Sequence, residues 1–133
     1  MKTYPLQISS PEGVIFKGDV VKVKCRTITG DLAILAGHIN YCTALGMGEA
    51  VIELEDGNRR SAACIGGMLS VMDGECHILA TTWEFAEDID LDRAKAALER
   101  AEKKLKETNL DDKEMRVAKA KLQRAMVRIG VRS

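Results

Sequence analysis

Aromatic side chains are scarce in this chain of 133 residues, which contains one tryptophan, two tyrosines and two phenylalanines. Proteins that bind single-stranded nucleic acid rely on exposed aromatic rings on which the bases stack. The composition therefore argues against nucleic acid as a partner. An apolar share of 46% and a charged share of 30% are instead typical of a soluble globular protein.

Long apolar runs are absent as well, because no stretch reaches the roughly 18 apolar residues that a membrane-spanning helix requires. The first residues, Met1–Pro5, lead directly into a strand-like pattern rather than into the apolar core of a signal peptide. The sequence predicts neither a membrane span nor secretion. Its length suits one ordinary domain of about 100–150 residues with an appendage.

The sequence has no C-x-x-C pair that could begin a zinc site or a redox centre. Its four cysteines, Cys25, Cys42, Cys64 and Cys76, are far apart and stand among apolar neighbours. We interpret all four as small buried hydrophobic residues rather than disulfide partners. This interpretation predicts a reducing, cytosol-like compartment.

Catalytic signatures are also missing, since the chain contains no GxxxxGK[ST], GxSxG or HExxH motif and no GxGxxG after a strand. His38 and His77 are the only histidines, and neither stands at a spacing that marks a triad or a metal site. The sequence predicts a structural or hydrogen-bonding role for both, no catalytic residue and no metal.

From Tyr4 to about Thr82 the chain shows a period of two. Val21, Val23 and Cys25 alternate with charged residues, and Ala50, Ile52 and Leu54 repeat this pattern. Asp56-Gly57 and Asp73-Gly74 predict hairpin turns, the first before a strand at 59–65 and the second between strands at 68–72 and 76–80. Short strands with glycine-rich turns and no helix between them indicate a flattened antiparallel β-sandwich over residues 1–88.

After Asp88 the period changes to that of a helix. Apolar residues recur at spacings of three and four, first as Leu91, Ala94, Leu98, Ala101 and Leu105, then as Met115, Ala118, Leu122, Ala125 and Ile129. The short break at 108–111, with Asp111 and Glu114 as a capping box, predicts an antiparallel two-helix hairpin over 89–133. The fold class is therefore α+β. Because the seam is rich in alanine, the two helices should hold each other weakly.

The net charge of zero conceals an asymmetry between the two parts. Residues 1–89 carry twelve acidic and seven basic residues, whereas residues 90–133 carry eight acidic and thirteen basic residues. From position 113 onward, seven cations accompany the single acid Glu114. Such a segment predicts an acidic or phosphate-bearing partner.

Three arginines of the helical part suggest where that partner binds. Arg93 stands in the first turn of a helix, where the dipole already favours negative charge, and Arg124 and Arg128 form a like-charged pair four residues apart. A polyphosphate held between the helices would relieve both strains, because arginine forks match phosphate oxygens. Two plainer readings stay open: that Asp90 and Asp92 compensate Arg93 locally, and that the arginines form a solvated face.

Three segments of the sandwich, Ser10–Gly13, Gly30–His38 and Ile65–Val71, resemble recurring segments of the epsilon subunit of the bacterial F-type ATP synthase, and the resemblance covers nearly the whole chain. It implies a non-catalytic rotor subunit at the cytoplasmic face of the bacterial cell membrane. The sandwich would then bind the gamma subunit and the c-ring. The hairpin would extend to the alpha and beta subunits and inhibit ATP hydrolysis, or fold back and release them.

The same resemblance implies a regulatory ligand. The segment from Ile89 to Ala94, which contains Asp90 and Arg93, is similar to the motif of epsilon subunits that bind ATP. The pair Arg124 and Arg128 and the carboxylate of Glu84 match the accompanying positions. We therefore expect ATP to favour the folded hairpin and to bind at six residues, with a role for Mg²⁺ left open: Glu84, Ile89, Asp90, Arg93, Arg124 and Arg128. Hydrolysis is not expected, because the pattern offers no positioned base or metal site.

Three alternative functions predict different partners or chemistry for this chain. The first keeps the rotor role without regulatory ATP, so that rotation or the proton gradient controls the hairpin and the arginines bind acidic segments of the catalytic subunits. The second is a free-standing module that binds nucleotides or nucleic acid and has no gamma partner. The third is an enzyme that uses Cys64 or His38.

Overall fold

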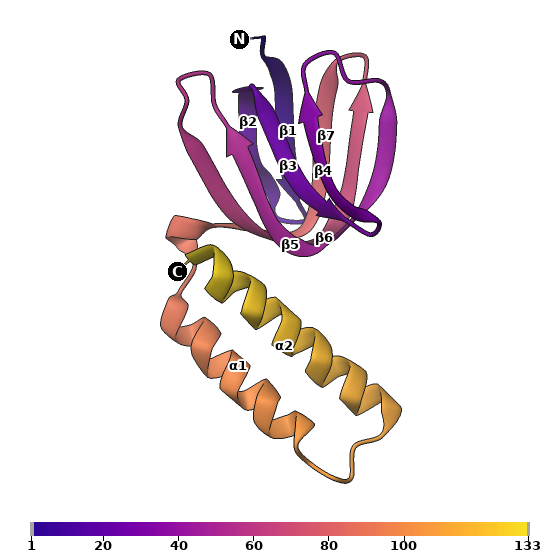
Figure 1. Ribbon diagram of the computed structural model, residues 1–133, viewed down its shortest axis with the longest axis vertical. Helices are drawn as coiled ribbons and strands as arrows, with labels where there is room; N and C mark the ends of the chain where they lie inside the picture. Colours follow the sequence, from indigo (N-terminus) through magenta and orange to yellow (C-terminus); the bar gives the residue numbers. More distant parts are fainter. Residues whose placement is uncertain (1, 133) are drawn as a thin grey trace. The chain divides into compact units, whose positions relative to one another are not determined.

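The computed structural model describes residues 2–132 and divides the chain into two compact units, Met1–Phe85 and Ala86–Ser133. The first unit consists of strands and the second of helices (Figure 1). This is the α+β architecture that the two sequence periods predict. The division lies just before the boundary at residue 88 that the change of period suggests.

Seven strands build the first unit: β1 Tyr4–Ser10, β2 Gly13–Val20, β3 Lys22–Thr27, β4 Gly30–Leu35, β5 Tyr41–Glu53, β6 Arg59–Met72 and β7 Glu75–Phe85. They follow one another in the order β2-β1-β7-β6-β5-β3-β4 and curl into a sandwich (Figure 1). Neighbouring strands are antiparallel, except that β1 runs parallel to β7. Both predicted hairpin turns are present, at 56–57 and at 73–74.

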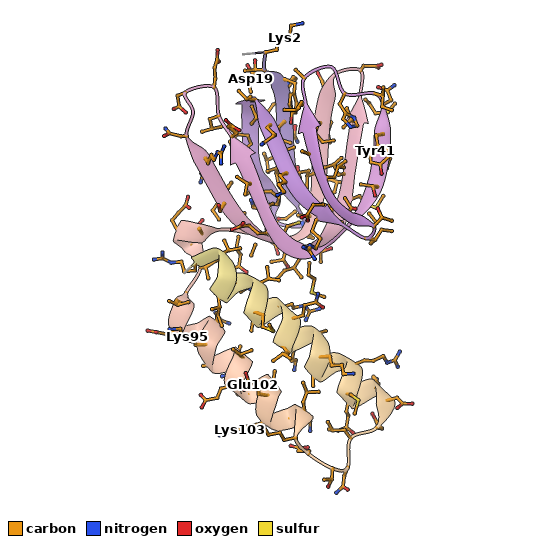
Figure 2. All side chains as sticks on the ribbon, in the orientation of Figure 1. Lys2, Asp19, Tyr41, Lys95, Glu102 and Lys103 are labelled. Carbon is orange, nitrogen blue, oxygen red and sulfur yellow. The ribbon has the colours of Figure 1, made fainter. Side chains whose placement is uncertain are left out.

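The core of the sandwich lies between its layers, where every second strand residue points inward (Figure 2). Val23 and Ile52 face each other across β3 and β5, and both are fully buried. The hydroxyl of Tyr4 donates a buried hydrogen bond of 2.6 Å to the carbonyl oxygen of Ile34. This bond joins β1 to β4, at the far end of the strand order, and so helps to close the sandwich.

Two glycines explain why β6 is one strand rather than the two segments that the sequence indicates. Gly66 and Gly67 have positive φ angles of 77° and 133°, which favour glycine strongly. A Cβ atom on Gly67 would lie 2.2 Å from the carbonyl oxygen of Leu79 on β7. The strand therefore continues through both residues, with its pairing to β7 in unchanged register.

Cysteine burial corrects one prediction. Cys25, Cys64 and Cys76 are buried in the core, and all four cysteines are free thiols, but Cys42 is exposed. Cys42 pairs with Ser70 on β6, and at that position its side chain points out of the sandwich. The interpretation of Cys42 as a buried residue was wrong, because apolar neighbours in the sequence do not reveal which residues of a strand face inward.

The second unit contains a single turn of 3-10 helix, η1 Ala86–Asp88, followed by α1 Leu91–Leu105 and α2 Asp112–Arg132. The two α-helices pack as an antiparallel hairpin, as predicted. Its seam is built from small side chains, and the buried residues of the two helices are Ala94, Ala101, Ala118, Ala125 and Val131. Met115, which the sequence pattern places in the seam, is instead 38% exposed.

Neither helix is long and apolar enough to cross a membrane within the described residues.

Candidate anion-binding site on the helical hairpin

The first helix begins at three of the predicted site residues. Ile89 is buried, Asp90 is the N-cap of α1, and Arg93 is exposed in the first turn. The Oδ1 atom of Asp90 accepts a hydrogen bond of 3.1 Å from the backbone N–H of Arg93. An N-cap acid satisfies one free N–H group and opposes the positive end of the helix dipole. Asp90 therefore gives the local compensation that the sequence left as an alternative to an external anion.

The register of the hairpin determines where the second pair of arginines lies. The Nζ atom of Lys104 on α1 is 3.6 Å from an Oε atom of Glu114 on α2. Because the two helices are antiparallel, residues nearer the start of α1 lie beside residues nearer the end of α2. By this register, Ala94 lies level with Ala125. Arg124 and Arg128, one turn apart, consequently lie beside the turn of α1 that contains Arg93. By this register the three arginines lie toward the same end of the hairpin, near the start of α1 and the end of α2.

Glu84 belongs to the other unit. It is the penultimate residue of β7 and pairs with Ala63 on β6. Five of the six predicted residues are thus on the hairpin and one is on the sandwich.

Sequence reasoning missed two further cations on the face that carries the arginines. Arg100 precedes the buried Ala101, just as Arg93 precedes Ala94 seven residues earlier, so both arginines lie along the same edge of α1. Lys121 lies one turn before Arg124 and two turns before Arg128 on α2. The signal was present in the sequence as three Arg-Ala pairs, at 93–94, 100–101 and 124–125.

The caps and ends of the hairpin carry ordinary surface interactions. Asp111 accepts a hydrogen bond of 2.7 Å from the backbone N–H of Glu114, as a capping residue for α2. Lys104 lies 3.1 Å from Glu107 as well as near Glu114, and the hydrogen bond to Glu107 raises the pKa of its ammonium group. These contacts stabilise the end of the hairpin at which the two helices are joined. They do not form part of the predicted anion-binding site.

The alternative of an enzyme depends on Cys64 or His38. Burial raises the pKa of the Cys64 thiol to about 12, so this thiol stays protonated near neutral pH and is a poor nucleophile. The Nδ1 atom of His38 lies 2.8 Å from the carbonyl oxygen of Ile39 on the surface. Residues 2–132 contain no group of three or more His, Cys, Asp or Glu side chains that could hold a metal ion.

A second surface feature lies on the outside of the sandwich. One row of laterally paired residues crosses five adjacent strands: Val14, Ser9, Leu79, Met68 and Ala44, on β2, β1, β7, β6 and β5. Its three large members are exposed, Val14 by 61%, Leu79 by 62% and Met68 by 44%. We call these five residues the apolar row. Large exposed apolar side chains gathered on one surface of this kind are typical of a place where another molecule docks.

Comparisons with known proteins agree over the full length of the chain. Residues 3–86 match the family model for the β-sandwich domain of the ATP synthase delta/epsilon chain, and residues 87–132 match the model for its long α-helix domain. The chain is 39% identical over 132 residues to an ATP synthase epsilon chain of Exiguobacterium sp., covering 99% of this chain and 97% of that one. It is 42% identical over 131 residues to that of Bacillus velezensis, with 98% of both chains covered.

Two solved structures have the same fold. A chain in the mitochondrial ATP synthase of Euglena gracilis, in an assembly of OSCP, F1 and c-ring, superposes with a TM-score of 0.81 at 25% identity, covering 91% of this chain and 76% of that one. A chain of the central stalk and c-ring of the Tetrahymena thermophila mitochondrial enzyme superposes with a TM-score of 0.62 at 15% identity, covering 97% and 96%.

Proposed function

Because the chain belongs to the delta/epsilon chain family of the ATP synthase, as a bacterial F-type epsilon subunit, we propose that it links gamma to the c-ring in the rotor and restrains ATP hydrolysis through its hairpin. The observation that supports this most is the match of both domains over residues 3–132 in their family order. In this role the subunit transmits torque and performs no chemistry itself. It is a peripheral component at the cytoplasmic face of the bacterial membrane.

The apolar row supports docking to gamma. Three of its side chains, Val14, Leu79 and Met68, are exposed, and burying apolar area contributes about 25 cal/mol per Å². A partner subunit that covers Met68 and Leu79 would remove these side chains from water. The c-ring is the second partner in this proposal, since the Tetrahymena structure contains the central stalk together with the c-ring.

The hairpin supports regulation by ATP. Arg93, Arg124 and Arg128 lie together only while α1 and α2 are paired. A nucleotide bound through its phosphates would therefore stabilise the paired hairpin, with Ile89 and Asp90 as further contacts. An extended hairpin, in contact with the alpha and beta subunits, is the state that inhibits hydrolysis.

The available free energy limits this switch. A ligand at 100 times its dissociation constant contributes about 2.7 kcal/mol to the state that binds it. ATP can then reverse the equilibrium only if the two hairpin states differ by less than this amount. The alanine seam, which buries little apolar area, makes such a small difference reasonable.

The alternative without regulatory ATP also has a specific observation in its favour. Asp90 already caps α1, so the helix end that contains Arg93 is compensated without a ligand. In this case rotation or the proton gradient sets the state of the hairpin, and the arginines bind acidic segments of the catalytic subunits.

Docking to gamma is tested by co-purification. Met68→Glu together with Leu79→Glu places two charges in the apolar row and should abolish recovery with gamma. Ile28→Glu, at an equally exposed position in the turn between β3 and β4, is the control and should leave recovery intact. Equal recovery of all three proteins would contradict docking on this surface.

Regulation is tested in the assembled enzyme. The rate of ATP hydrolysis is compared between the full chain and a chain truncated after Asp88, while titration calorimetry measures ATP binding to the isolated subunit. We expect truncation to raise hydrolysis, and millimolar ATP to relieve inhibition only in the full chain. Binding without relief would favour the alternative, and equal hydrolysis rates would exclude the hairpin as an inhibitor.

A further inference from the structure

One face of the hairpin is almost entirely cationic. The residue before each buried alanine on α1 is an arginine, Arg93 or Arg100, and Lys104 continues this edge one turn later. The contact between Lys104 and Glu114 shows that this edge borders the edge of α2 on which Glu114, Val117, Lys121, Arg124 and Arg128 follow one another at helical spacing. We call the surface that carries Arg93, Arg100, Lys121, Arg124 and Arg128 the arginine face.

The cations of this face have few counter-charges in the chain. Within residues 2–132, Arg93, Arg100, Lys121 and Arg124 form no ion pair, and all four are exposed. On these two edges, Glu114 lies against Lys104, and Asp90 caps the start of α1 beside Arg93. No acidic residue follows Glu114 in α2. The face therefore keeps a concentrated positive charge that an external anion would neutralise.

The arginine face is longer than the cluster of residues assigned to the nucleotide. Arg93, Arg124 and Arg128 lie at one end of the hairpin, whereas Arg100 lies seven residues further along α1, about 10 Å at 1.5 Å per residue. Lys121 extends the face in the same direction on α2. A triphosphate held by the first group leaves Arg100 and Lys121 without a counter-charge. A longer chain of phosphates would reach both groups.

The chemistry of the face selects phosphate over other polyanions. Four of its five cations are arginines, whose planar forks bind phosphate oxygens in pairs. Residues 86–133 contain no aromatic side chain, so the hairpin offers no surface on which the bases of a nucleic acid could stack. The uncharged residues between the cations are Ala97 and Val117, which cannot bind the side chains of a peptide specifically.

We propose that the arginine face binds a linear inorganic polyphosphate longer than a triphosphate, along the bordering edges of α1 and α2. This proposal shares Arg93, Arg124 and Arg128 with the proposed nucleotide site, and Arg100 and Lys121 distinguish it. The bound chain neutralises like charges on both helices and so holds the hairpin paired.

Calorimetric titration of the full chain with long-chain inorganic polyphosphate, tripolyphosphate and ATP tests the proposal. We expect the long chain to bind at least about tenfold more tightly than tripolyphosphate, which corresponds to about 1.4 kcal/mol. The double variant Arg100→Gln, Lys121→Gln should lose most of this advantage. Glutamine is a good helix former, and far-ultraviolet circular dichroism verifies that the helices persist.

The matched control is the double variant Lys95→Gln, Lys119→Gln, which removes the same charge. Lys95, in the first turns of α1 (Figure 2), and Lys119 each follow a buried alanine and lie on the opposite edges of the hairpin. This control should retain the advantage of the long chain. An equal loss in both variants, no dependence on chain length, or equally tight binding of polyglutamate would overturn the proposal.

The result for ATP separates the two proposals. Binding of long polyphosphate by a chain that does not bind ATP supports the arginine face and contradicts the nucleotide site. Binding of ATP with no preference for the long chain supports the nucleotide site and contradicts the proposal that the arginine face binds polyphosphate.

Discussion

At the scale of single residues, Gly67 shows how a close backbone approach restricts the sequence. Its φ of 133° is accessible to glycine, and an added Cβ would meet the carbonyl oxygen of Leu79 at 2.2 Å and the Cα of Ala80 at 2.8 Å. Both atoms belong to the backbone of β7, which cannot move without disturbing its pairing with β6. This residue therefore combines conformational strain with a steric limit.

Gly67→Ala should lower the free energy of unfolding by more than about 3 kcal/mol, measured by urea denaturation of the full chain. Gly57→Ala is the control, because Gly57 also has a positive φ of 88° but has open space around its missing side chain. The control should cost only about 1 kcal/mol. Similar losses in both variants would show that backbone strain, rather than the contact with β7, limits position 67.

The buried thiols make the sandwich sensitive to alkali. Burial raises the pKa of Cys64 and of Cys76 to about 12, from about 9 in the unfolded chain. Above pH 9 the unfolded state loses protons that the folded state retains, so the free energy of unfolding falls as pH rises from 9 toward 12. Each thiol contributes up to about 1.4 kcal/mol per pH unit in this window.

Denaturation curves between pH 8 and pH 11 measure this dependence. Cys76→Ala should reduce the slope of stability against pH by about one proton, whatever its cost at neutral pH. Cys42→Ala is the matched control, because it removes a thiol that is exposed and lies outside the core. A wild-type chain whose stability does not change over this range would contradict the assignment of the thiols to the core.

At the scale of elements, the N-cap of α1 separates capping from ligand binding. Asp90 accepts a hydrogen bond from the backbone N–H of Arg93 and is also a predicted ATP contact. Asp90→Ala should destabilise the hairpin by about 1 kcal/mol, whereas Asp90→Ser keeps a capping oxygen and should restore most of that loss.

The two variants therefore give a clear test when melting curves and ATP titrations are measured together. If Asp90 contacts the nucleotide, both variants should weaken ATP binding, because serine lacks the carboxylate. If Asp90 acts only as a cap, Asp90→Ser should bind ATP as tightly as the wild type. The latter result would remove Asp90 from the predicted site.

At the scale of the whole molecule, the division into two units has consequences for folding. The sandwich has its own core, centred on residues such as Ile8, Val23, Ile52, Leu69 and Ile78. The hairpin, by contrast, depends on a seam of alanines that bury little area. The first unit should therefore be stable by itself, and the second should be the weaker of the two.

A chain truncated after Asp88 should be soluble, melt cooperatively and still co-purify with gamma, as calorimetry and affinity purification would show. Its control is the full chain under the same conditions. An insoluble fragment, or one that melts without a cooperative transition, would mean that the hairpin completes the core of the sandwich.

The architecture could be predicted from the sequence, because the spacing of apolar residues reflects which side of each strand or helix is buried. A period of two in the first part and spacings of three and four in the second each require one apolar face, and the β-sandwich and the antiparallel hairpin follow from them. The turns at 56–57 and 73–74 and the cap at Asp111 were also predictable, because they depend on local backbone chemistry.

Tertiary structure decided the features that depend on contacts between distant segments. The parallel pairing of β1 with β7, the outward position of Cys42 and the exposure of Met115 depend on which segments pack together, and no local pattern encodes this. The same holds for the arginine face. The Arg-Ala pairs are visible in the sequence, but the packing of α1 against α2 places Arg100 and Lys121 on one surface with the predicted arginines.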